Sequence, residues 1–119
     1  MELKVFLERL MELFERSAMA YHEYLDAGKT FQFARQLKLH NTEALKLLEE
    51  NKSSLPATLQ PDAQALIIHY KEWSMNWEKL AAEKNYAPDE VFVFTNYSTF
   101  PKQAAQYLER YYRELISNR

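Results

Sequence analysis

The sequence predicts an all-α fold, a bundle of four mostly antiparallel helices that forms one domain over residues 1–119. One glycine and four prolines among 119 residues supply too few turn signals for a β fold. Apolar residues also recur at spacings of three and four in four long segments, as on the buried face of a helix. The composition, 47% hydrophobic and 27% charged, is that of a globular chain with a hydrophobic core.

The first predicted helix covers about residues 2–26 and carries two adjacent rows of apolar side chains. The rows are Leu3, Phe6, Leu10, Leu13 and Leu7, Met11, Phe14, Ala18, Tyr21, Leu25. Two rows give more apolar surface than a peripheral helix of a small bundle needs. A homodimer formed through this helix is therefore one hypothesis.

The second predicted helix covers about residues 31–51 and follows the first after a short turn. Gly28 suits the C′ position of the first helix, and the hydroxyl of Thr30 can cap the second. The short turn predicts that these two helices are antiparallel neighbours. Asn41 is the polar exception in the apolar stripe of the second helix.

Two further helices are predicted over about residues 61–84 and 101–117. Pro61 and Asp62 suit the first turn of the third helix, whose stripe includes Trp73 and Trp77. The residues expected to face inward from the fourth helix are Ala104, Tyr107, Leu108, Tyr111 and Leu115. The aromatic residues of these two helices, including Tyr112, could line a ligand pocket, although helical spacing favours a role in the core.

The connection over residues 85–100 is longer than a bundle needs. It contains a strand-like run, Val91-Phe92-Val93-Phe94, and the further aromatic residues Tyr86, Tyr97 and Phe100. It could pack over the end of the bundle, present a surface or a strand edge to a partner, or act as a mobile lid. The residues expected to contact a partner protein are Tyr86, Phe92, Phe94, Tyr97, Phe100 and Tyr112.

Composition excludes several classes of function. The chain has no cysteine, which excludes a disulfide framework, a thiolate nucleophile and a cysteine-ligated metal. Its 15 basic and 17 acidic residues are mixed along the chain, so the broad positive field that favours nucleic acid is missing. We find no secretory signal and no membrane-length apolar run, which fits a cytoplasmic protein without a membrane partner.

A metal site is the sharpest alternative. Measured along the helix axes from the turn between the first two predicted helices, His40 lies at roughly 17 Å and His69 at roughly 21 Å. These similar distances allow the two residues to meet. Each is followed by an acid one turn later, which gives the candidate ligand set His40, Glu43, His69 and Glu72. The order His-x-x-Glu is the reverse of the Glu-x-x-His of di-iron bundles, so boundary histidines with a satisfied ring nitrogen are the simpler interpretation.

Two other catalytic patterns fail on geometry. The pairs Glu12-x-x-Glu15 and Glu23-x-x-Asp26 resemble the acidic motifs of all-α nucleotide pyrophosphohydrolases, but all four acids fall on one predicted helix and cannot converge. Arg35 and His40 have the Arg-x4-His spacing of HEPN ribonucleases, yet five residues place them about 140° apart on a helix. No serine has a glycine elbow or an evident base.

The sequence therefore predicts a non-enzymatic interaction or regulatory module that binds another protein through residues 85–100 and the adjacent helix faces. No cofactor is expected in this interpretation. The alternative is a bundle that binds a small ligand or a metal through His40, Glu43, His69 and Glu72, either with or without catalytic activity.

Overall fold

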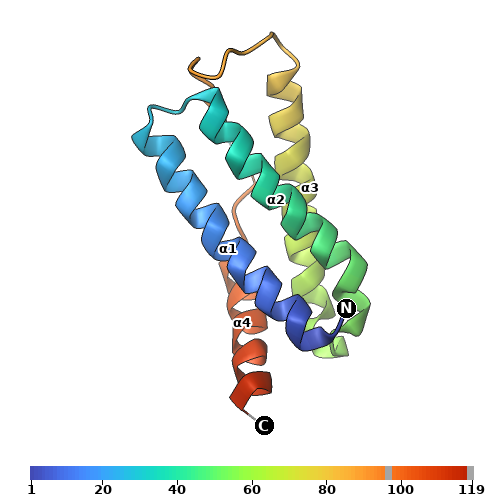
Figure 1. Cartoon of the computed structure of the whole chain (residues 1–119). Coiled ribbons are helices and arrows are strands. Elements are labelled where there is room, and N and C mark those ends of the chain that lie inside the picture. Colours follow the sequence, from blue (N-terminus) through green and yellow to red (C-terminus); the bar gives the residue numbers. More distant parts are fainter. Residues whose placement is uncertain (96–97, 118–119) are drawn as a thin grey trace.

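The computed structural model describes residues 1–95 and 98–117 and confirms an all-α helical bundle. Its helices are α1 (Leu3–Asp26), α2 (Phe31–Asn51), α3 (Gln60–Ala81) and α4 (Lys102–Ser117) (Figure 1). Two short 3-10 helices, η1 (Lys52–Ser54) and η2 (Ala57–Leu59), lead from α2 into α3. None of the helices in this part of the chain is long and apolar enough to cross a membrane.

The fourth helix covers only the lower half of the bundle. α4 has 16 residues, whereas α1, α2 and α3 have 24, 21 and 22. Figure 1 shows α4 beside the lower ends of α1 and α3. The lower core therefore draws on all four helices, and its buried residues are Phe6, Leu7, Leu10, Leu13, Ala44, Leu47, Leu48, Leu55, Ala63, Leu66, Ile67, Tyr70, Ala104 and Leu108.

In the upper half, the connection supplies core side chains, because the short α4 does not reach this level. Between the observed ends of α3 and α4 the connection covers residues 82–101. Phe92 of the connection is fully buried. Its ring lies 5.2 Å from that of Phe31, 5.1 Å from that of Trp77 and 4.9 Å from that of Tyr86, measured between centroids. Trp73 and Trp77 are both buried, as their positions in the apolar stripe predicted. The upper core is thus aromatic, and part of it comes from outside the helices.

The backbone of the connection caps the N-terminus of α2. The first N–H groups of a helix have no acceptor within the helix. Here the N–H of Phe31 donates to the carbonyl of Glu90 at 2.8 Å, and the N–H of Gln32 donates to the carbonyl of Pro88 at 2.9 Å. In the reverse direction, the N–H of Phe92 donates to the carbonyl of Lys29 at 2.8 Å.

This arrangement corrects the prediction that Thr30 caps α2 through its hydroxyl. The side chain of Thr30 makes no capping hydrogen bond, and its Oγ1 is buried without a partner among the described residues. The connection occupies the N–H of Gln32, one of the donors that an N-cap hydroxyl would use. Residues 29–31 and 90–92 instead form an isolated antiparallel bridge, and no longer strand occurs in the described part of the connection.

The hydroxyl of Tyr24 on α1 fixes the connection at a second point. It donates a hydrogen bond to the carbonyl of Phe92 and accepts one from the N–H of Phe94 at 3.2 Å. Burial raises the pKa of Tyr24, which keeps the hydroxyl protonated and able to donate. The segment 92–94 is therefore fastened to α1 and to the turn between α1 and α2.

The short α4 leaves part of α1 uncovered, and one residue of α4 that was predicted to face inward does not. The upper part of the second apolar row of α1, from Ala18 through Tyr21 to Leu25, is exposed, because α4 does not extend far enough to cover it. Tyr107 is exposed rather than inward-facing, and its hydroxyl accepts a hydrogen bond from Gln103 on the same side of α4. The third helix ends at Ala81, about one turn earlier than the sequence predicted.

Replacing Tyr24 with phenylalanine should weaken the attachment of the connection. The substitution removes one hydroxyl that serves two backbone groups, so we expect the free energy of unfolding to fall by about 1–3 kcal/mol in urea denaturation. Tyr21→Phe is the control, because Tyr21 is exposed and its hydroxyl has no hydrogen bond to the described residues. Equal stability of the two variants would contradict this account.

Candidate ligand-binding site

The upper half of the bundle contains a cavity of about 460 Å³. It lies between α1, α2, α3 and the connection, beside the level at which α4 begins. The wall consists of Phe14, Ser17, Ala18, Tyr21, Tyr24, Ala34, Leu37, Asn41, His69, Tyr70, Trp73, Trp77, Phe94 and Phe100. A full-length fourth helix would fill such a space, whereas here only the extended connection crosses it.

Aromatic side chains form most of the cavity wall, and several hold one another in place. Phe94 meets the ring of Trp73 edge to face, with 5.2 Å between centroids. Phe100 contacts Phe14 in the same way at 5.8 Å, and it contacts His69 at 5.4 Å. Since edge-to-face contacts of this kind favour one arrangement of the rings, the connection forms an ordered side of the cavity.

A buried polar pair interrupts the apolar wall. Asn41 has an exposed fraction of only 6%, and its Oδ1 accepts a hydrogen bond of 2.9 Å from the hydroxyl of Ser17 on α1. The sequence singled out Asn41 as the polar exception in its stripe, and the structure places it on the cavity wall. A buried amide is expensive unless its groups are hydrogen-bonded, so its unused donor is available to a ligand.

Trp77 also lines the cavity, through its aromatic ring. Its Nε1 is buried and has no hydrogen-bond partner among the described residues. The ammonium of Lys38 lies 4.9 Å from the centre of the Trp77 ring and also forms an ion pair with Glu78. Desolvation by burial lowers the pKa of Lys38. Lys38 does not itself line the cavity.

His69 is buried on the α3 side of the cavity. Its Nδ1 lies 3.0 Å from the hydroxyl oxygen of Ser98, and its ring packs edge to face against Tyr70 at 5.2 Å. Burial lowers the pKa of His69, and the opposing effect of the Glu72 carboxylate is smaller. The imidazole is therefore neutral near pH 7.

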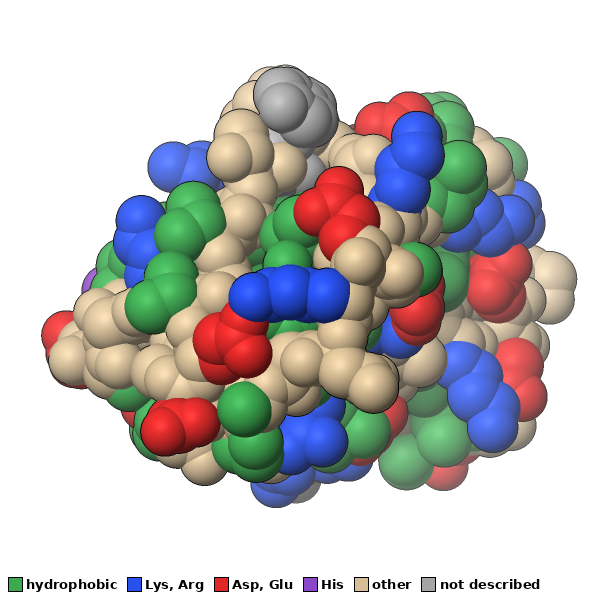
Figure 2. Space-filling model, turned by 90° about the horizontal axis from the view of Figure 1, so that it is seen from above, with side chains coloured by type: hydrophobic (Ala, Val, Ile, Leu, Met, Phe, Trp, Pro, Cys, Tyr) green, Lys and Arg blue, Asp and Glu red, His purple; other side chains and the backbone are tan. Residues whose placement is uncertain are grey.

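The cavity wall carries no formal charge near neutral pH. Its lining includes no lysine, arginine, aspartate or glutamate, and its histidine is neutral. On the outside of the molecule, by contrast, basic and acidic side chains are interspersed, as the view from above shows (Figure 2). The charged groups on this face lie at the surface, and the interior cavity is neutral.

The four predicted metal ligands do not form a cluster. His69 lines the cavity, but His40 lines a different hollow, between α1 and α2, together with Arg16 and Glu23. No group of three or more histidine, cysteine, aspartate or glutamate residues suited to a metal occurs within residues 1–95 and 98–117.

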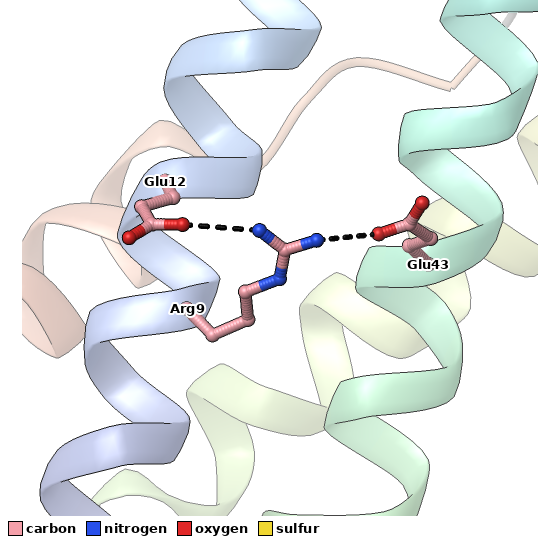
Figure 3. A network of polar contacts seen from close by, with 3 residues as sticks. All are labelled: Arg9, Glu12 and Glu43. Atoms are coloured by element: carbon pink, nitrogen blue, oxygen red, sulfur yellow. Dashed lines mark hydrogen bonds and ion pairs between the residues drawn. The ribbon is translucent and has the colours of Figure 1, made fainter.

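Glu43, another of the four predicted metal ligands, forms an ion pair with an arginine. Arg9 of α1 contacts the Glu43 carboxylate at 2.9 Å and the Glu12 carboxylate at 3.0 Å, so its guanidinium joins α1 to α2 (Figure 3). The pKa of Arg9 is raised by the hydrogen bond to Glu12, with a further contribution from Glu43. Glu43 thus has a structural partner on the α1–α2 surface.

The predicted partner-binding aromatics mostly face inward. Phe92 is in the core, Tyr86 and Phe94 are half-buried against the upper core, and Phe100 and Tyr112 pack against the lower core. Tyr97 lies outside the described residues. The exposed side chains of this run are Val91 and Val93, with exposed fractions of 56% and 55%. The alternation Val-Phe-Val-Phe could have indicated this, since successive side chains of an extended segment point to opposite sides.

The aromatic pocket that the sequence suggested between the third and fourth helices is located differently. Trp73 and Trp77 do line a cavity, but its other walls come from α1, α2 and the connection. Tyr107 and Tyr111 instead border a shallow surface hollow near η2. Sequence reasoning missed Ser17 and Tyr24 as site residues, although a serine within an apolar helix was a usable signal.

The comparisons with known proteins give no family for this chain. No protein-family model matches it, and neither a curated protein nor a solved structure is significantly similar to it. The function must therefore be inferred from the cavity and the surface.

The stability of the protein should decrease on acidification because of His69. Above about pH 6.5 the ring is neutral in both the folded and the unfolded chain, so it contributes no pH dependence. As the pH falls below 6.5, the unfolded chain binds a proton that folded His69 resists, and the free energy of unfolding decreases until the pH passes the lowered pKa.

Urea denaturation between pH 7.5 and pH 5 tests this expectation, with pH steps of about 0.5. In His69→Gln the free energy of unfolding should decrease less between about pH 6.5 and pH 5 than it does in the wild type. His22→Gln is the control, because His22 is exposed on α1. If the free energy of unfolding of His69→Gln decreases with acidification as much as that of the wild type, His69 does not cause the decrease.

Proposed function

We propose that this protein binds a small, mainly apolar molecule in the cavity between α1, α2, α3 and the connection. The observation that carries the proposal is that this cavity of about 460 Å³ is lined mainly by aromatic side chains, among them the buried residues Tyr70, Trp73 and Trp77. Small-molecule sites are commonly clefts of roughly 300–1,000 Å³ with apolar and aromatic walls. Protein interiors are otherwise close-packed, so an apolar space of this size gains stability when a ligand fills it.

The composition of the wall supports binding rather than catalysis. Nδ1 of His69 lies 3.0 Å from the Ser98 hydroxyl oxygen, but nucleophilic catalysis by a hydroxyl and a base also uses a third group that orients the base. Beside His69, the described wall offers hydroxyl groups, an amide and aromatic rings, without a carboxylate or an amine. A ligand would be held by contact with rings and oriented by a few hydrogen bonds.

Access is expected along the upper part of α1. Ala18 and Tyr21 are the exposed members of the wall, so the cavity meets solvent on this side. The opposite sides are closed by buried residues such as Ala34 and Tyr70. A larger side chain at Ala18 would therefore obstruct the opening without replacing a core residue.

Titration with N-phenyl-1-naphthylamine, a neutral probe that becomes fluorescent in apolar sites, tests the proposal. We expect saturable binding of one probe per chain, and at least about tenfold weaker binding to Ala18→Trp. Met19→Trp is the matched control, because Met19 is exposed on α1 and faces a different hollow. Absence of saturable binding, or equal binding to both variants, would reject the cavity as the site.

A second candidate function, binding of a protein partner, is favoured by the outer edge of the connection. The backbone groups of Phe92 and the N–H of Phe94 are hydrogen-bonded to the α1–α2 hairpin. The N–H and carbonyl groups of Val91 and Val93 have no such bond within the described residues. An extended peptide could pair with this edge by strand addition while contacting the two exposed valines.

A pull-down with the variant Val91→Lys/Val93→Lys as bait, compared with the wild type, tests this second function. The substitutions leave the buried face of the segment intact, so the variant should stay folded and lose its partner. Ile68→Lys/Met75→Lys is the control, because these exposed apolar residues lie elsewhere, on α3. Undiminished capture by the folded valine variant would count against the edge.

Self-association through α1 is a further hypothesis about the surface. Met19, Tyr21 and Leu25 are exposed apolar residues on its upper half. Sedimentation that shows only a species of 14.2 kDa at micromolar concentration would rule out the homodimer.

A further inference from the structure

The charge of the ligand can be argued from the cavity wall. Moving an ion from water into a site without an opposite charge is costly, and such a site selects neutral molecules. None of the described wall residues is charged at neutral pH, because His69 is neutral and burial raises the pKa of Tyr70 far above the physiological range. A carboxylate or an ammonium ion would find no counter-ion there.

The shape of the ligand follows from the rings that surround it. Trp73, Trp77 and Phe94 lie on one side, and Phe14 and Phe100 lie toward α1 and the lower core. Flat aromatic molecules make offset-stacked and edge-to-face contacts with such rings, which adds to the gain from burial. A branched or spherical molecule of the same volume would use fewer of these contacts.

The polar pattern of the ligand follows from the unused groups. The Nε1–H of Trp77 is buried without a partner among the described residues. The amide nitrogen of Asn41 forms no hydrogen bond within residues 1–95 and 98–117, since its bond to Ser17 uses Oδ1 only. Both side chains are at least nine-tenths buried on the cavity wall, but the Trp77 Nε1 atom is fully buried, so the Asn41 nitrogen is the donor that a ligand can reach.

Ser17 gives the Asn41 amide a defined orientation. Because the Ser17 hydroxyl donates to Oδ1, the amide is turned so that its nitrogen is the group left for a ligand. This nitrogen is not fully buried, so an acceptor on a ligand can reach it and form a hydrogen bond that a hydrocarbon cannot form. The wall thus favours molecules that carry an acceptor oxygen over pure hydrocarbons.

We infer that the ligand is a neutral, flat aromatic molecule that carries a hydrogen-bond acceptor such as a ketone or amide carbonyl, with Asn41 as its donor. The inference rests on the proposed function of the cavity and adds the chemical class of its ligand. The acceptor meets the amide nitrogen of Asn41 near Ser17, while the ring system occupies the aromatic space.

Three naphthalene compounds of similar shape test the chemical class by displacement of N-phenyl-1-naphthylamine and by calorimetry. They are 2-acetonaphthone, which is neutral with a carbonyl, 2-ethylnaphthalene, which has no acceptor, and 2-naphthoate, which is an anion. We expect the ketone to bind about tenfold more tightly than the hydrocarbon, and the carboxylate to bind more weakly than both.

The variant Ser17→Ala/Asn41→Leu identifies the donor. It removes the polar pair together and preserves the approximate volume of the amide, so no buried hydroxyl is left unpaired. Trp77→Phe is the control, because it removes a donor that is not open to the cavity and keeps an aromatic ring. We expect the tenfold preference for the ketone to disappear in Ser17→Ala/Asn41→Leu and to persist in Trp77→Phe, with hydrocarbon binding changed less than threefold.

The outcomes separate this inference from the proposed function. If the fluorescent probe binds in the cavity but the hydrocarbon or the carboxylate binds best, the chemical class is wrong and the cavity stands. A ketone preference that survives in Ser17→Ala/Asn41→Leu also overturns the inference. If neither the probe nor any of the three compounds binds, the proposed function fails, and the inference fails with it.

Discussion

The N-terminus of α2 needs hydrogen-bond acceptors, and the backbone of the connection supplies them. Two N–H groups of the first turn of α2 donate to carbonyls of residues 88 and 90, and the N–H of Phe92 donates back to Lys29. The hydroxyl of Tyr24 then binds the next part of the same segment. Because these bonds fix the backbone of residues 88–94, the rings of Phe92 and Phe94 take defined positions against α3.

The position of the connection in turn determines the cavity. In a bundle with four equal helices, a fourth helix would cover the upper half of α1 and α3. Here α4 begins at Lys102, and an extended chain with a few large side chains takes its place higher up. An extended segment has less volume per unit length than a helix, so it closes the upper end of the bundle without filling its interior. The space that remains is the candidate site.

The sequence was sufficient for the helices and for most of the lower core. Periodicity placed α1 and α2 within a residue of their bounds, and it placed Trp73 and Trp77 against the core. It could not show that the upper part of α1 beside Tyr21 stays uncovered, or that Tyr107 faces outward from α4. Local rules also assigned the cap of α2 to Thr30, because an acceptor sixty residues away in the chain leaves no local signal.

The candidate site was only partly predictable for the same reason. Asn41 stood out because a polar residue in an apolar stripe calls for a partner, and that partner is Ser17. Phe92 and Phe94 were recognised as unusual, but their inward orientation depends on the anchor at Tyr24. The histidine pair was misleading, since a similar level along two helices says nothing about the face on which each residue lies. His40 and His69 line different hollows.

The central claim is that the connection keeps an apolar, accessible cavity in the upper half of the bundle. A crystal structure under xenon pressure is the most direct test, because xenon enters apolar cavities without needing any specific chemistry. The account predicts xenon between α1, α2 and α3, in contact with Trp73 and bordered by Phe94, with segment 88–94 in place. A structure in which Phe94 or Trp73 fills that space and no xenon binds there would contradict it.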